Sequence, residues 1–125
     1  MNNFERKLDD KKRLTIPVEV RPELKGDYLV LTKGYDNTLA LYSQQYYEEV
    51  IEPALEGDFR DAESFRLNRQ IQSGQSIMQM DAKQGRITIE QRFLDYAGIT
   101  KTVNAFRVKT TGGKSYWAIE ASAAA

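Results

Sequence analysis

Short apolar runs separated by polar turns make up the first third of the chain, and this pattern predicts β-strands more than long helices. Strands are predicted over residues 4–8, 14–16, 28–32 and 38–42, because alternate side chains of a strand point to opposite faces. The third of these runs is almost continuously apolar, so it is expected to be buried on both faces. The sequence Gly-Tyr-Asp-Asn at 34–37 supplies a hairpin turn.

Helical spacing replaces this alternation in three places. A short helical turn is predicted over 18–24, and Ser43 is a suitable N-cap for a longer helix. The apolar face of that helix would be formed by Tyr47, Val50, Ile51, Ala54 and Leu55. Pro53 is expected to stop or bend it, because proline in a helix interior removes a hydrogen bond and costs about 3 kcal/mol. Another helix is predicted over 60–70.

The pattern of the first third begins again at about residue 76. Strands are predicted over 77–80, 86–90, 102–110 and 115–120, with a helix over 91–97, a Gly98 terminator and a hairpin turn at 111–113. Aligning Arg13 with Arg86 gives an offset of 73 residues (86 − 13) and places Phe93 at the position of Val20. The chain is therefore expected to contain two copies of one unit.

This repeat divides the chain into four segments. The first unit is predicted over residues 1–43, connecting helices over 44–75, the second unit over 76–120 and an unstructured tail over 121–125. A chain of 125 residues is long enough for one domain, or for two small units that share a core. The expected fold class is α+β and rich in β-structure.

The amino-acid composition limits the kinds of catalytic and metal-binding site that the chain can form. The chain contains no cysteine and no histidine, which excludes disulfides and removes the commonest general base and metal ligand. Glu48 and Glu49 are neighbours and diverge on a helix, so they do not form a paired acid and base. We therefore expect no enzymatic activity, cofactor, metal or small-molecule substrate. Without a long apolar run or a signal peptide, we expect a cytoplasmic location and no membrane partner.

The charges sum to zero but are separated along the chain. Residues 44–58 hold five acids and no base, so the remainder sums to +5. Residues 5–13 hold five bases against three acids. Such separation can give one face a positive potential that steers an anionic partner. The alternative, that these are ordinary solvated surfaces, remains open on charge alone.

The repeated loop between the first two strands of each unit carries an Asp followed by an Arg. In the first copy Asp9 precedes Arg13 by four residues, and in the second Asp81 precedes Arg86 by five. Either Ala82 is an insertion that widens the second loop, or Asp81 no longer pairs with Arg86. In a purely structural interpretation, each carboxylate fixes its loop by accepting hydrogen bonds from turn amides or from the Arg.

In the functional interpretation, the same scaffold holds basic side chains toward a nucleic acid. An arginine offers a planar fork to guanine edges or phosphate, and lysines add point charge. The candidate DNA-binding residues are Lys7, Lys11, Lys12, Arg13, Lys83 and Arg86. The candidate loop-structuring residues are Asp9, Asp81 and Gly85.

Both halves resemble the MraZ family of regulators. The resemblance rests on LDDKKRLTIP at 8–17 and LVLTKGYDNTLALY at 29–42, and on MDAKQGRITI at 80–89 and LDYAGITK at 94–101. It implies two tandem AbrB-like βαββ units, each with an Asp-x-x-x-Arg signature, in one intertwined barrel of the double-psi or swapped-hairpin type. It also implies several chains in a homo-oligomeric ring.

For function, the resemblance implies a bacterial, cytoplasmic and nucleoid-associated transcription factor. Its partner would be double-stranded DNA carrying short, G-rich direct repeats upstream of a cell-division and cell-wall gene cluster. AbrB-like and MazE-like proteins share the single motif, so an antitoxin-like module remains the alternative. Its protein partner would bind the acidic helix around residues 48–56.

Overall fold

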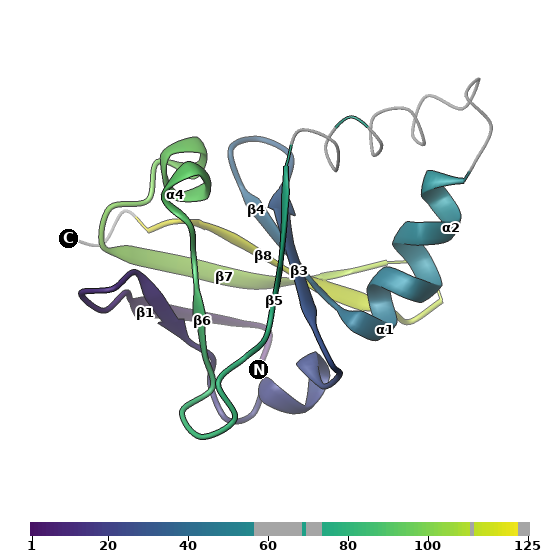
Figure 1. Ribbon diagram of the computed structural model, residues 1–125, viewed down its shortest axis with the longest axis horizontal. Coiled ribbons are helices and arrows are strands. Elements are labelled where there is room, and N and C mark those ends of the chain that lie inside the picture. Colours follow the sequence, from purple (N-terminus) through teal and green to yellow (C-terminus); the bar gives the residue numbers. More distant parts are fainter. Residues whose placement is uncertain (57–68, 70–73, 111, 123–125) are drawn as a thin grey trace.

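The computed structural model describes residues 1–56, 69, 74–110 and 112–122, and within them the fold is α+β and rich in β-structure (Figure 1). The strands are β1 (Asn3–Lys7), β2 (Arg13–Thr15), β3 (Leu29–Lys33), β4 (Leu39–Ser43), β5 (Gln75–Met78), β6 (Arg86–Thr88), β7 (Thr102–Lys109) and β8 (Ser115–Ala121). The helical elements are η1 (Arg21–Leu24), α1 (Gln44–Tyr46), η2 (Tyr47–Ile51), α2 (Glu52–Leu55) and α4 (Gln91–Ala97).

The predicted strands are confirmed within two residues at each end, and the helix over 91–97 is confirmed with its predicted bounds. Gly98 ends it in the left-handed conformation, at φ 66°. β8 reaches Ala121, which pairs with Val103, so regular structure enters the predicted tail by one residue. The helix predicted over 60–70 lies outside the described residues except for residue 69, and so does residue 111 of the predicted turn.

The two halves exchange strands. The six-stranded antiparallel sheet has the order β1-β7-β8-β4-β3-β5, so the β3–β4 hairpin of the first half is bordered by β5 of the second. In the same way the β7–β8 hairpin of the second half is bordered by β1 of the first. The second sheet is the β2–β6 pair, with one strand from each half. Neither half therefore completes a sheet alone, and both contribute to one core.

The repeat appears in the structure as a near two-fold relation. Leu14 pairs with Ile87, its own equivalent at the 73-residue offset. The Ile16 N–H donates to the Gly85 carbonyl at 2.7 Å, and the Ile89 N–H donates to the Lys12 carbonyl at 3.0 Å. These two bonds are related by the same offset, so the axis of the repeat passes through the β2–β6 pair.

The main core lies between this pair and the inner face of the large sheet. Leu14, Ile87, Val20 and Phe93 are all at most 1% exposed. The expected equivalence of Val20 and Phe93 agrees with their backbone contacts, because the Val20 N–H donates to the Pro17 carbonyl and the Phe93 N–H to the Glu90 carbonyl, at the same offset. One face of the β2–β6 pair packs on this core, which leaves the opposite face of the pair free for polar side chains.

The helical segment after β4 begins as predicted and runs through the predicted apolar face to Leu55. The Ser43 hydroxyl accepts from the Tyr46 N–H at 3.1 Å, which confirms the N-cap. Pro53 does not stop the segment, because it lies in the first turn of α2, where its missing N–H is tolerated. The preceding turn, η2, is a π-helix in which the Glu52 N–H donates to the Tyr47 carbonyl. No helix among the described residues is long and apolar enough to cross a membrane.

Candidate nucleic-acid interface

The β2–β6 pair is a two-stranded ribbon with one apolar and one polar face. Leu14 and Ile87 point into the core, so the alternating side chains of the same strands point outward. The outward residues are Arg13, Thr15, Arg86 and Thr88. Arg13 pairs with Thr88 and Thr15 pairs with Arg86. The ribbon therefore presents two guanidinium groups placed diagonally on one face.

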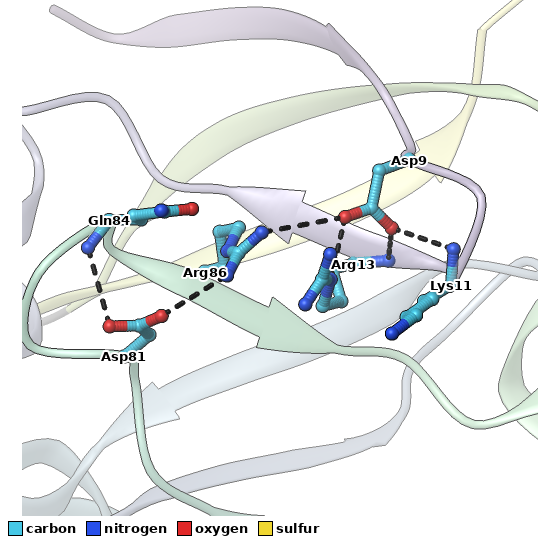
Figure 2. A network of polar contacts seen from close by, with 6 residues as sticks. All are labelled: Asp9, Lys11, Arg13, Asp81, Gln84 and Arg86. Atoms are coloured by element: carbon cyan, nitrogen blue, oxygen red, sulfur yellow. Dashed lines mark hydrogen bonds and ion pairs between the residues drawn. The ribbon is translucent and has the colours of Figure 1, made fainter.

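The first loop is held by the carboxylate of Asp9 (Figure 2). Its Oδ1 accepts from the backbone N–H groups of Lys11 and Arg13, both at 2.9 Å. Its Oδ2 accepts from Nε of Arg13 at 2.6 Å. The Lys12 N–H also donates to the Asp9 carbonyl at 3.0 Å, with Lys12 at φ 60°. Asp9 thus fixes both the turn and the direction of the Arg13 side chain.

The second loop keeps this arrangement despite its extra residue. Oδ1 of Asp81 accepts from the Lys83 N–H at 2.8 Å, and Oδ2 accepts from Nη2 of Arg86 at 3.3 Å. Asp81 is therefore still the partner of Arg86. The turn is wider, because the Gly85 N–H donates to the Asp81 carbonyl four residues back, at 2.8 Å. Gly85 has φ 64° and takes the place of Lys12.

Hydrogen bonding lowers the pKa of both carboxyl groups. For Asp9 the main cause is the backbone N–H of Arg13, and for Asp81 it is the backbone N–H of Lys83. Because the folded-state pKa lies below the unfolded value, these contacts stabilise the loops above the unfolded pKa. That contribution is lost as the pH falls through the folded pKa.

We expect the loop amides to report this titration. The amide proton shifts of Lys11 and Lys83 should titrate with midpoints below 3.8, the ordinary value for Asp, when followed by NMR at decreasing pH. Asp9→Asn should abolish the titration at Lys11 and leave that at Lys83 intact. An unchanged Lys11 titration in this variant would show that Asp9 does not hold the first loop.

The four candidate lysines are all exposed, and three of them lie in the loops that flank the ribbon. Lys7 ends β1, Lys11 and Lys12 lie in the first loop, and Lys83 lies in the second. Arg86 also lies near the first loop, because its Nη1 is 3.9 Å from Oδ2 of Asp9. An open hollow of about 480 Å³ adjoins the arginines and is lined by Arg13, Gln79, Met80, Asp81, Ala82, Arg86 and Thr88. Gln79, Met80 and Thr88 were not among the sequence candidates.

Arg21 is a second addition to the site. Its Nε donates to the Ile16 carbonyl and its Nη2 to the Gln84 carbonyl, each at 2.9 Å. Both acceptors are backbone atoms, and Gln84 is 63 residues away in sequence. No side-chain motif marks such a contact, which is why the sequence pattern assigned Arg21 only to a helical turn.

Comparison with known proteins gives consistent matches. Residues 1–70 match the family described as "MraZ protein, putative antitoxin-like". The protein named transcriptional regulator MraZ of Rhodococcus opacus is 36% identical over 101 residues, covering 81% of this chain and 69% of the relative. The protein of that name from Mycobacterium ulcerans is 35% identical with the same coverage. That from Desulforamulus reducens is 34% identical over 110 residues, covering 88% and 76%.

Proposed function

The chain belongs to the MraZ family, and on that premise we propose that it is a DNA-binding transcriptional regulator. The proposed contact surface is the outward face of the β2–β6 ribbon together with the loops 9–13 and 81–86. The observation that carries the proposal is the placement of Arg13 and Arg86 on this face, each held by a carboxylate of its own loop. No cofactor, metal or catalytic step enters the proposal.

The ribbon suits double-stranded DNA in size and chemistry. The major groove of B-DNA is about 12 Å wide and admits a two-stranded β-ribbon. Among the described residues, the side chain of Arg13 is held through Nε, which leaves its two terminal nitrogens available for a guanine edge. The exposed lysines beside the ribbon would neutralise phosphates and supply affinity that does not depend on sequence.

The preferred DNA, we further propose, carries short, G-rich direct repeats upstream of a cell-division and cell-wall gene cluster, as the family resemblance implies. The strand exchange between halves supports an intertwined AbrB-like barrel, and several chains would form a ring at the nucleoid. One chain offers two arginines and four lysines, which is a weak site. Several linked copies on tandem repeats would gain avidity without new contacts.

Fluorescence anisotropy with a duplex of tandem G-rich repeats tests this function. We expect binding that needs more than one repeat and weakens steeply with salt. If the four lysines each neutralise one phosphate, the slope of log K against log salt is about −3 to −4 per chain. A shuffled duplex of equal length is the control. No binding at low salt by the folded protein would refute the DNA-binding function.

A protein-interaction role is the second candidate, because the matching family is described as antitoxin-like. The segment from α1 to α2 offers a surface for it, with exposed acids at Glu48, Glu49, Glu52 and Glu56. A stoichiometric protein partner whose binding is lost in the Glu48→Lys, Glu52→Lys double variant would favour this role. If this double variant binds the tandem-repeat duplex as well as the wild type does, the result favours the DNA-binding role.

A further inference from the structure

The two loops differ in what supports them. The side chain of Arg13 is held within its own loop, since Asp9 accepts from Lys11 and from both the backbone N–H and Nε of Arg13. The second loop is one residue longer, and its Asp81–Arg86 contact is longer, at 3.3 Å against 2.6 Å. A longer loop with a weaker internal contact needs support from elsewhere to hold its arginine in one direction.

That support comes from the first half of the chain. Arg21 in η1 bridges the end of β2 to the second loop through the Ile16 and Gln84 carbonyls. The bridge passes directly over Gly85, because a Cβ at that position would overlap the Nε and Cζ atoms of Arg21. Gly85 is therefore needed both for its positive φ and for the close approach of this side chain.

A second contact from the first half reaches the arginine itself. Nη1 of Arg86 lies 3.9 Å from Oδ2 of Asp9, while its Nη2 contacts Asp81. Figure 2 shows Arg86 between the two carboxylates. The first half thus holds the backbone of the second loop through Arg21, and it contacts the guanidinium of Arg86 through Asp9.

The arginine bridge has no counterpart at the equivalent position of the second half. At the 73-residue offset, Arg21 corresponds to Leu94, which is 1% exposed and lies in the apolar core. A leucine has no donor with which to hold the first loop. The two units therefore differ in sequence at this position, with an arginine in the first unit and a buried leucine in the second.

We propose that Arg21 is a positioning residue for Arg86: it fixes the second loop from the first half of the chain, so that both arginines meet the DNA as one preordered surface. The effect on DNA rests on the proposed function, whereas the effect on the loop does not. Without the bridge, Arg86 would have to be ordered during binding, and this ordering lowers affinity by about three- to tenfold.

Arg21→Met tests the bridge in the free protein. Methionine retains a stem that can cover Gly85 but removes both donors. Backbone ¹⁵N relaxation and hydrogen exchange should show increased motion over residues 81–86. The motion over residues 9–13 should stay as it is in the wild type. Lys25→Ala is the matched control, because it removes one positive charge from an exposed position just after η1 and should alter neither loop. A second loop that stays as rigid as in the wild type, or a variant that fails to fold, would overturn the proposal.

Binding of the same variants to the tandem-repeat duplex tests the effect on DNA. Arg21→Met should weaken binding three- to tenfold in the wild-type background and have no further effect in an Arg86→Ala background. Equal losses in both backgrounds would overturn the assignment to Arg86. If the wild type does not bind DNA at all, the DNA function fails, while the relaxation result still decides whether Arg21 fixes the second loop.

Discussion

Replacement of Arg13 by alanine is expected to abolish specific DNA binding while the protein remains folded. Loss of one arginine–guanine contact costs about 1–3 kcal/mol, and in an assembly this loss recurs at every repeat that is bound. The fold should survive because the Arg13 side chain is partly exposed and its described contact is with Asp9. Fluorescence anisotropy gives the affinity, and circular dichroism gives the fold.

Arg13→Lys separates charge from geometry in this experiment. Lysine keeps the positive charge but cannot offer two parallel donors to a guanine edge. We expect it to retain binding to the shuffled duplex and to lose the preference for repeats. A normal affinity of Arg13→Ala for repeats would contradict the assignment of this side chain, and so would an unfolded variant.

Leu14→Ala is expected to give the largest loss of stability. Leu14 is fully buried and pairs with Ile87, its equivalent in the second half. Residues of both halves therefore pack around it. Truncation of a buried leucine costs about 2–5 kcal/mol, which is a large part of the total stability of a small domain. Urea unfolding followed by circular dichroism measures the change from the shift in midpoint at constant slope.

The neighbouring residue provides the control for this loss. Thr15 lies on the opposite, exposed face of β2, and Thr15→Ala should change stability by less than about 0.5 kcal/mol. A Leu14→Ala variant as stable as the wild type would mean that the ribbon is not anchored in the shared core. Comparable losses in both variants would mean that the two faces of β2 are not distinguished as described.

The elements with strong local signals were predictable from the sequence. Alternation located the strands, and Gly98 marked the end of α4. The structural role of the repeated Asp was also predictable, because Asp side chains accept hydrogen bonds from turn amides. Asp9 and Asp81 both do so, which also settles that the extra residue widens the second loop without breaking its contact to Arg86.

Contacts between the two halves could not be predicted in this way. The repeat indicated two equivalent units, but alternation alone does not say which strand borders which, and the exchange of β1 and β5 is a tertiary feature. Arg21 was missed because its acceptors are main-chain carbonyls. Pro53 was judged by its penalty in a helix interior, whereas the preceding π-turn places it in the first turn of a new helical element.

Mapping of the DNA contact surface by NMR tests the central claim most directly. The protein would be titrated with the tandem-repeat duplex, and amide shift changes would be assigned along the chain. We predict that the changes concentrate in residues 9–15 and 81–88, and that residues 44–55 are unaffected. Changes confined to the segment from α1 to α2, or no changes with a duplex that the assembly binds, would contradict the ribbon as the DNA-contacting surface.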